Sequence, residues 1–308
     1  MLPIIGVVTS SLSTVYLVLV LNTIQVLSIL VYPFSPKLCR SINRVCARHI
    51  WCVWTVLGER MLGIDIKMTG TKPPMRQNAL ILSNHRAMTD ILCLLSLAWR
   101  CGRLADLKWF VKDQLKWVPG VGWGMKFMDC IFVRRNWQED KKGIEALFGD
   151  FKRNDIAMWL VSFLEGTRFS SSKNAASRTF AASRNLYQPT HTLVPRVKGF
   201  VASVEGLRTH ADAVYVVTIA YDHDDPSLYR WFNLQMPKVE MHVEVHPIET
   251  LPTDEAGLSQ WAYDQYEAID QHLIRFKETG SMGDENFAKP IKTSHSFRPE
   301  SRRTHFEE

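Results

Sequence analysis

The most apolar part of the chain lies near its N-terminus. No Asp, Glu, Lys or Arg occurs before Lys37, and residues 12–31 are mostly Leu, Val and Ile. About 20 residues of this kind cross the core of a bilayer at a helical rise of about 1.5 Å each. No basic region precedes the run and no small-x-small cleavage site follows it, which favours a retained segment over a cleaved signal peptide. The pattern predicts a membrane-anchoring helix, with a buried core helix of a soluble protein as the alternative.

Basic residues follow this apolar run at near-helical spacing. They are Lys37, Arg40, Arg44 and Arg48. Under the positive-inside tendency these side chains would face the cytosol and its anionic lipids. Residues 50–57 form a second apolar stretch, which is too short to cross a bilayer unaided. We therefore expect residues 1–60 to be an N-terminal membrane anchor, built either with a spanning helix or as a shallow hairpin in one leaflet.

The remaining pattern is that of one globular domain. Strand-like apolar runs alternate with helical or irregular stretches at residues 79–83, 108–111, 130–133, 157–163, 213–220 and 239–245. This alternation over about 200 residues indicates a single α/β domain, which we assign to residues 61–280. Thr253 is the predicted cap of a final helix that runs to Thr279 and stops at Gly280. Residues 281–308 contain little to bury, so we expect a polar, mobile tail.

A histidine and an aspartate stand five residues apart at a predicted strand-to-helix junction. Residues 79–83 are typical of a buried strand and residues 91–95 of a packed helix, with His85 and Asp90 between them or at the boundary. A neutral imidazole can take a proton from an attacking hydroxyl when an acceptor holds its other ring nitrogen. We expect Asp90 to be this acceptor, which requires that His85 lie just outside the helix or that the first turn bend.

A second charged loop, Phe-Leu-Glu-Gly-Thr-Arg, occupies residues 163–168. Neither motif places a Ser or Cys as a nucleophile, which favours direct attack by a substrate hydroxyl on an activated acyl group. General-base help to such an attack is worth about 10²–10⁴ in rate. The two motifs together indicate an acyl-transfer site.

Four blocks in the same order resemble the glycerolipid acyltransferase family, whose members acylate lysophosphatidic acid and related lysophospholipids. The blocks are residues 84–90 (Asn-His-x₄-Asp), 132–135 (Phe-x-x-Arg), 163–168 (the family's Phe-Pro-Glu-Gly-Thr-Arg) and 193–200, which contain the late proline. The resemblance runs over residues 80–276. It implies an α/β catalytic domain with a mixed sheet flanked by helices, preceded by an N-terminal membrane-anchoring helical segment.

The resemblance also implies roles for individual residues. His85 is similar to the family's general base and Asp90 to its orienting partner. The residues that match the family's binding of the acceptor phosphate and glycerol are Arg135, Glu165, Gly166, Thr167 and Arg168. The residues that match as supporting parts of the motifs are Asn84, Arg86 and Pro195. Ala87 and Leu164 depart from the commonest pattern of Ser and Pro, which leaves the headgroup preference more open than the reaction class.

The chemistry of the arginine and glycine residues agrees with a role in binding phosphate. Guanidinium groups bind phosphate through a fixed, bidentate fork of donors, which suits Arg135 and Arg168. Gly166 lets the backbone come close to a phosphate. Glu165 is an anion and cannot bind phosphate directly, so we expect it to hold an arginine or to accept a hydrogen bond from a glycerol hydroxyl.

Histidine and cysteine patterns outside the motifs indicate no metal site. His242 and His246 alternate with apolar residues, which predicts one polar face of a strand rather than metal ligands. The six cysteines include no Cys-x-x-Cys pair and are typical of reduced thiols in a cytosol-facing protein. The net charge of +6 and the pI near 9.0 fit anionic lipid and CoA phosphates. They would also fit nucleic acid, but no nucleic-acid motif supports a nucleic-acid partner.

We therefore expect an acyl-CoA-dependent 1-acylglycerol-3-phosphate O-acyltransferase that converts lysophosphatidic acid to phosphatidic acid. Acyl-CoA would be the co-substrate, acyl carrier protein remains an alternative donor, and we expect no cofactor. The enzyme would be integral to, or tightly associated with, the reticulum membrane of a eukaryote or the inner membrane of a bacterium, with its catalytic face in the cytosol. The oligomeric state and the acyl-chain length stay open.

Three other functions remain open or disfavoured. The nearest rival is a remodelling acyltransferase for another lysophospholipid such as lysophosphatidylinositol. A non-catalytic membrane lipid-binding protein of the same fold is a rival from another class, although the intact His85 and Asp90 argue against it. A soluble serine hydrolase is disfavoured because the chain has no Gly-x-Ser-x-Gly elbow.

Overall fold

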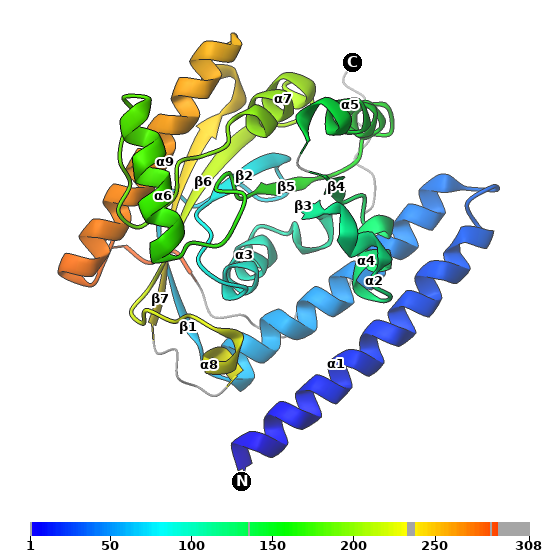
Figure 1. The fold of residues 1–308 in the computed structure, drawn as a ribbon. Coiled ribbons are helices and arrows are strands. Elements are labelled where there is room, and N and C mark those ends of the chain that lie inside the picture. The colour runs from blue at the N-terminus through cyan, green and yellow to red at the C-terminus, as the bar shows by residue number, and fades with distance from the viewer. Residues whose placement is uncertain (1, 135, 233–237, 284, 289–308) are drawn as a thin grey trace, which may run out of the picture.

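The computed structural model describes residues 2–134, 136–232, 238–283 and 285–288 (Figure 1). The helices are α1 (Leu2–Leu27), α2 (Pro36–Val56), α3 (Thr89–Arg100), α4 (Val121–Phe127), α5 (Trp137–Arg153), α6 (Ser171–Ser183), α7 (Lys198–Leu207), α8 (Leu228–Phe232) and α9 (Glu255–Thr279). The strands are β1 (Asp65–Gly70), β2 (Ala79–Ser83), β3 (Leu107–Lys112), β4 (Ile131–Val133), β5 (Trp159–Ser162), β6 (Ala213–Tyr221) and β7 (Lys238–Pro247). Each predicted strand is therefore present, and β1 is an additional one.

The seven strands form one mixed sheet in the order β1-β7-β6-β2-β5-β3-β4. Strands β6, β2, β5, β3 and β4 are mutually parallel, whereas β7 runs antiparallel to β6 and β1 runs parallel to β7. The carboxyl ends of β2, β5 and β6 consequently lie side by side at one edge of the sheet. In open α/β sheets this edge is the usual place for a binding site.

Strand β2 lies at the centre of the sheet, between β5 and β6, and all five of its residues are buried. A strand with parallel neighbours and helices over both faces favours a continuous apolar run, which is what residues 79–83 provide. Successive side chains point to opposite faces. Leu80 and Leu82 pack in one core cluster, and Ile81 packs in the other.

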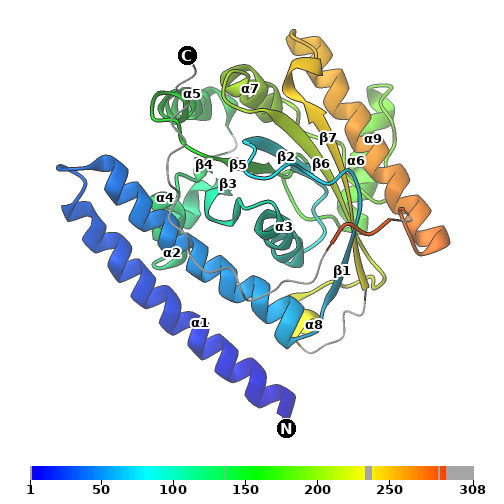
Figure 2. The ribbon, with the colours of Figure 1, turned by 180° about the vertical axis from the view of Figure 1, so that it is seen from behind.

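Helices cover both faces of the sheet (Figures 1 and 2). Helices α2 and α3 pack over one face, where Leu95 of α3 meets Ile81 and Val161 in one apolar cluster. Helices α5, α7 and α9 pack over the other, where Phe148 and Ile269 join Leu82 in the second cluster. The expected α/β domain with a mixed sheet flanked by helices is therefore confirmed.

The final helix differs from its prediction at the cap. Asp254, not Thr253, is the N-cap residue, and its Oδ1 accepts a hydrogen bond from the Gly257 backbone N–H at 2.7 Å. A carboxylate at this position also suits the positive end of the helix dipole. The C-terminal prediction is confirmed, since α9 ends at Thr279 and Gly280 takes the left-handed conformation with φ +77°.

Helix α1 runs alongside α2 on the outside of the domain, in the opposite direction (Figures 1 and 2). Within the described residues, no helix is long and apolar enough to span a membrane. The membrane anchor expected at residues 1–60 stays a prediction.

Two arginines of the basic cluster on α2 pair with acidic residues of the α/β domain. The Arg40 guanidinium pairs with Asp129 at 3.3 Å and with Asp150 at 3.0 Å, and Arg44 pairs with Asp106 at 2.8 Å. Positions 40 and 44 are one helical turn apart, so they share the face of α2 that packs on the α/β domain. Helical spacing alone did not predict these protein partners, and the orientation of the cluster toward the cytosol stays a prediction.

The first residues of the expected tail belong to the folded domain. Met282 is 1% exposed, and its backbone N–H donates to Glu240 Oε1 at 2.7 Å. The Phe287 N–H donates to the Met68 carbonyl of β1 at 2.8 Å. Residues 281–283 and 285–288 therefore lie against β1 and β7, and the rest of the predicted tail lies outside the described residues.

Candidate active site

His85 lies in the loop that follows β2, at the carboxyl edge of the parallel strands. Asn84 fixes the start of this loop: its Oδ1 accepts from the Ile219 N–H at 2.8 Å and its Nδ2 donates to the Ile219 carbonyl at 3.0 Å. The side chain therefore continues the pairing of β2 with β6 by one step. Because Asn84 is also buried, both of its polar groups need these partners.

Asp90 meets His85 across the first turn of α3. Asp90 Oδ2 lies 2.9 Å from His85 Nδ1 and also accepts the backbone N–H groups of Arg86 at 2.7 Å and Ala87 at 2.9 Å. His85 stands outside the helix, which starts at Thr89, so the five-residue separation is bridged by the bent entry to the helix. The contact expected between His85 and Asp90 is thus present, with His85 just outside the helix.

The second oxygen of the Asp90 carboxylate is held by Tyr221 at the end of β6. The Tyr221 hydroxyl donates to Asp90 Oδ1 at 2.6 Å. Burial, followed by the charge of Asp90, raises the pKa of this phenol well above its usual range, so the hydroxyl keeps its proton and remains a donor. Asp90 is completely buried, and its two oxygens accept four hydrogen bonds.

This arrangement assigns the tautomer of His85. A carboxylate only accepts, so Nδ1 of His85 carries the proton and Nε2 carries the lone pair. The imidazole ring stacks on Phe163, with 4.1 Å between ring centroids and 14° between planes, and Phe163 in turn stacks on Trp109. The side chain of His85 is 16% exposed. The geometry therefore presents an oriented, partly accessible imidazole that can act as a general base.

Glu165 joins three of the sequence blocks. Its Oε1 accepts from the His85 N–H at 2.7 Å, and its Oε2 accepts from the Leu193 N–H at 3.1 Å. The residue is 3% exposed, and burial raises the pKa of its carboxyl well above the usual range, although the two amide donors oppose this shift. Both oxygens are occupied by backbone donors, so the geometry favours a positioning role for Glu165 over the predicted contact with an arginine or the acceptor glycerol.

The rest of the second block forms a tight, more exposed loop. Gly166 has φ +67°, and a Cβ at this position would lie 3.2 Å from Arg196 Cδ. The Thr167 hydroxyl and the Arg168 carbonyl both accept hydrogen bonds from Lys173 Nζ, at 2.8 and 2.9 Å. Arg168 is exposed at the turn, two residues beyond Gly166. Gly166 is thus needed for the turn itself, which brings Arg168 to the surface beside the His85 loop.

Three predicted site residues remain: Pro195, Arg86 and Arg135. Pro195 is buried, next to Arg196, whose N–H donates to the Leu164 carbonyl at 2.8 Å. Arg86 lies over the ring of Phe169 at 4.7 Å and donates to the Asp224 carbonyl at 3.1 Å. Arg135 lies outside the described residues. The late proline block is therefore tied to the second block, while Arg86 sits at the rim of the site.

The sequence analysis missed three buried residues that support the site. Tyr221 holds Asp90, and Tyr266 of α9 donates to the Ser83 carbonyl and accepts from the Leu164 N–H, both at 2.8 Å. Asp270 of α9 accepts the backbone N–H groups of residues 190–192 at 2.6–2.9 Å. Tyr221 was detectable in principle, as a polar residue at the carboxyl end of a strand that neighbours β2. The α9 residues carried no comparable signal.

Comparison with known families agrees with this site. A family model described as "Acyltransferase" matches residues 65–222, which include the four blocks, and one described as "Acyltransferase C-terminus" matches residues 230–304. The chain belongs to this acyltransferase family. The acyltransferase class of the enzyme predicted from the sequence is thereby confirmed.

Named relatives cover most of the chain. The "1-acyl-sn-glycerol-3-phosphate acyltransferase 2" of Brassica napus is 34% identical over 89% of this acyltransferase and 73% of its own length. The protein of the same name from Arabidopsis thaliana is 34% identical over 86% of this chain and 70% of its own. The human "1-acyl-sn-glycerol-3-phosphate acyltransferase delta" is 29% identical over 88% of this chain and 73% of its own length.

Among solved structures, the chain is similar to "the 1-acyl-sn-glycerophosphate (LPA) acyltransferase, PlsC, from Thermotoga maritima". The TM-score is 0.48 and the sequence identity 18%, over 84% of this chain and 95% of that one.

Proposed function

We propose that this acyltransferase moves a fatty acyl group from acyl-CoA to the free hydroxyl of 1-acyl-sn-glycerol-3-phosphate and thereby makes phosphatidic acid and CoA. The observation that carries this proposal is the His85–Asp90 contact, with Asp90 fully buried and His85 Nε2 left as the base. The names of the plant and human relatives supply the acceptor.

In the proposed reaction His85 Nε2 removes the proton of the glycerol hydroxyl as its oxygen attacks the thioester carbonyl. A carbon–oxygen bond forms, the carbon–sulfur bond breaks, and the proton held by the imidazolium passes to the leaving CoA sulfur. Asp90 stabilises the imidazolium between these two steps, because its Oδ2 lies 2.9 Å from Nδ1. No side-chain nucleophile and no covalent enzyme intermediate are required.

The acceptor phosphate would bind at the loop of residues 165–168. Arg168 is exposed there and offers a bidentate fork of donors to phosphate. Glu165 would act through the backbone, since it holds the His85 and Leu193 amides and so fixes the base relative to this loop. Arg168→Ala should raise the KM for the phosphorylated acceptor about 10- to 100-fold with little change in kcat, as expected for loss of a charge-assisted contact made equally in ground and transition states. An unchanged KM would remove Arg168 from the phosphate site.

Membrane association is part of the proposal. Large apolar side chains of α1, α2 and the turn between them are exposed; they include Tyr16 at 71%, Leu19 at 60%, Leu30 at 70%, Phe34 at 89% and Leu38 at 52%. An apolar surface of this kind on a soluble monomer is unusual and marks an interaction site. We propose that it inserts into one leaflet, which would bring the lipid acceptor to the cytosolic face of the enzyme.

Vesicle flotation tests the leaflet insertion. The double variant Leu30→Glu/Phe34→Glu should lose most binding to phosphatidylcholine–phosphatidylglycerol vesicles, since two charges would enter the apolar layer. Met75→Glu is the matched control, because Met75 is also 60% exposed but lies in the loop between β1 and β2. Equal flotation of the double variant and the wild type would contradict the insertion.

The catalytic proposal is tested by thiol release from oleoyl-CoA or palmitoyl-CoA with the detergent-purified protein. Release should require lysophosphatidic acid, should be weak with lysophosphatidylinositol or no acceptor, and should fall by about 10²–10⁴ in His85→Ala. His49→Ala is the matched control, because His49 is exposed on α2 and its Nδ1–H donates to the Val45 carbonyl at 2.7 Å. Preference for lysophosphatidylinositol would instead assign a remodelling enzyme, and full activity of His85→Ala would refute the base.

A further inference from the structure

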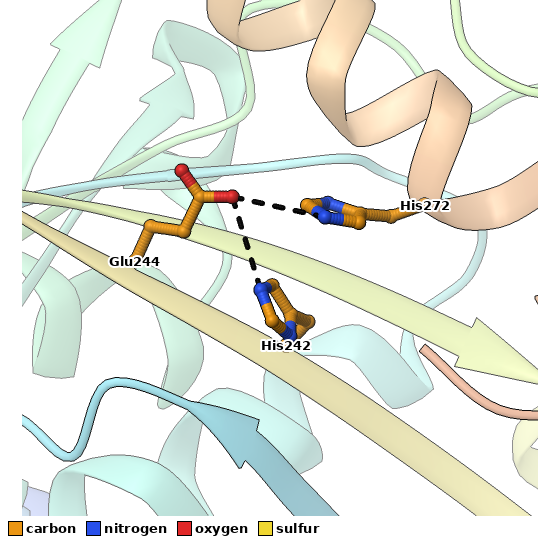
Figure 3. Close-up of side chains that lie close together, drawn as sticks. All are labelled: His242, Glu244 and His272. Carbon is orange, nitrogen blue, oxygen red and sulfur yellow. Dashed lines mark ion pairs between the residues drawn. The ribbon is translucent and has the colours of Figure 1, made fainter. Parts of the chain in front are cut away.

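Three side chains that are distant from His85 meet between β7 and α9. His242 and Glu244 are two residues apart on β7 and point to the same face of the strand, and His272 reaches them from α9 (Figure 3). The sequence showed only the alternation on β7, because His272 follows His242 by a long stretch of chain. The three side chains are partly buried, with exposed fractions of 17%, 31% and 23%.

The three side chains converge through the atoms that bind metals. Glu244 Oε1 lies 3.8 Å from His242 Nε2 and 3.8 Å from His272 Nε2, and the three ligand atoms lie within 4.8 Å of one another. Ligands of a tetrahedral zinc ion lie about 3.3 Å apart when each is about 2.0–2.1 Å from the metal. Each Glu–His pair would therefore have to close by about 0.5 Å, and the two imidazole nitrogens, which lie within 4.8 Å of each other, by up to about 1.5 Å.

Thr69 of β1 orients the first histidine. It lies opposite His242 in the register of β1 with β7, and its Oγ1 is 3.0 Å from His242 Nδ1. When the Thr69 hydroxyl donates to the Met241 carbonyl, 3.4 Å away, it can accept from Nδ1–H of His242. The Nε2 lone pair of His242 then points at the Glu244 carboxylate, where a cation would satisfy both. A hydroxyl or carbonyl partner on the second ring nitrogen is the usual support of a metal-binding histidine.

His246 lies beside the carboxylate. Its Nε2 lies 3.3 Å from Glu244 Oε2, the oxygen that does not face His242 and His272. Glu244 Oε1 is left facing the two imidazoles of His242 and His272.

The charges and solvent exposure around His242, Glu244 and His272 are compatible with a bound cation. Arg275, the nearest opposing charge on α9, is exposed, and water and salt screen it. The partial exposure of all three ligands leaves a path for an ion.

We propose that His242, Glu244 and His272 bind a divalent cation of the zinc class, with two imidazole nitrogens and one carboxylate oxygen as ligands and water completing the shell. Two neutral imidazoles with a carboxylate suit Zn²⁺ and its neighbours in the first transition row better than Mg²⁺ or Ca²⁺, which prefer oxygen.

The cation would clamp α9 to the sheet. Helix α9 also carries Tyr266 and Asp270, which hold the backbone at Ser83, Leu164 and residues 190–192. Metal binding at His272 would therefore stabilise the packing of the helix that supports the acyl-transfer site from behind, without contact with either substrate. The binding itself does not depend on which acceptor the enzyme uses.

Metal stoichiometry tests the proposal directly. Tag-free, full-length protein is stripped with a chelator, incubated with ZnCl₂, desalted and analysed for zinc by mass spectrometry. We expect about one zinc per chain in the wild type and less than about a tenth of this in Glu244→Gln and in His272→Gln, because each variant removes one of three ligands. At a free Zn²⁺ concentration about 100-fold above the dissociation constant, the wild-type Tm should rise by about 5 °C.

Two controls separate this site from other binding. His49→Gln removes an exposed histidine from α2 and should retain the zinc of the wild type. Replacement of zinc by Co²⁺ should give visible d–d absorption without thiolate charge-transfer bands, which would otherwise indicate one of the six free cysteines. Far-UV circular dichroism shows whether Glu244→Gln and His272→Gln are folded. The proposal is overturned if the reloaded wild type holds less than about a tenth of an equivalent of zinc, or if both folded variants bind as much as the wild type.

Discussion

Replacement of Asp90 by Asn tests whether the carboxylate supplies charge or only geometry. Asp90 Oδ2 accepts from two rigid backbone donors, the N–H groups of Arg86 and Ala87, as well as from His85 Nδ1. An amide at position 90 should therefore keep its oxygen in this place and turn its NH₂ toward Tyr221, whose hydroxyl can rotate and accept. The variant should keep the His85 tautomer and lose only the negative charge.

The expected loss follows from the change in that one hydrogen bond. A bond between ionised partners is worth about 1.5–3 kcal/mol and a neutral one about 0.5–1.5 kcal/mol, so the imidazolium of the proposed reaction loses about 1–1.5 kcal/mol of stabilisation. This corresponds to a decrease in kcat of about 5- to 15-fold. In serine-protease triads, where the same substitution leaves the wrong tautomer, the loss is about 10⁴-fold.

The assay is steady-state thiol release with saturating oleoyl-CoA and varied lysophosphatidic acid. Asp264→Asn is the matched control, because Asp264 lies on the exposed face of α9 and contacts only the neighbouring Gln260 side chain among the hydrogen bonds of the described residues. A loss of less than about threefold in Asp90→Asn would show that the charge is irrelevant, and a loss near 10⁴ would show that the two backbone amides do not hold the amide oxygen in place. Either result refutes the reasoning.

Three further predictions concern stability. Tyr221→Phe removes the donor to Asp90 Oδ1 and should lower the free energy of unfolding in urea by about 1–3 kcal/mol, and an unchanged midpoint would contradict this. Gly166→Ala forces a Cβ onto φ +67° and should cost about 1–2 kcal/mol, whereas Gly143→Ala, in α5 with open space around it, should be neutral or stabilising; equal effects would exclude backbone strain at Gly166. Burial lowers the pKa of His191 below its usual value. Near pH 6 the unfolded chain therefore binds more protons at this residue than the folded chain does. The contribution of His191 to stability is thus present above about pH 6.5 and is lost as the pH falls. His191→Gln should flatten the decline of Tm between about pH 7.5 and pH 5, and an identical decline would assign it to other groups.

The sequence was sufficient to locate the junction that carries His85 and Asp90 because the relevant signals there are local. The apolar run of β2, the polar His85 loop and the start of α3 follow one another within residues 79–90. Strand β1 was missed for the opposite reason. Its sequence, Asp-Ile-Lys-Met-Thr-Gly, carries polar residues and a glycine, and its burial depends on β7, which is distant in the sequence.

The orientation of α2 shows a second limit of local patterns. Arg40 and Arg44 fit the positive-inside tendency equally well whether they face lipid or protein. Their partners Asp106, Asp129 and Asp150 lie on three separate segments that only the tertiary fold brings together. A helical pattern therefore predicts which residues share a face, but the partner of that face is set by the packing of the whole domain.

Glu165 explains why blocks that look independent in the sequence act as one unit. Its two oxygens hold the amide of His85 in the first block and the amide of Leu193 in the last. A glutamine in its place could accept at one of these amides but would present NH₂ to the other, which would leave a buried donor without an acceptor. Since the His85 N–H is one of the two, the base would move relative to the loop that carries Arg168. Two acceptor oxygens at position 165 are therefore required to fix the His85 loop relative to the loop that carries Arg168, even though the carboxyl group touches neither substrate in the proposed reaction.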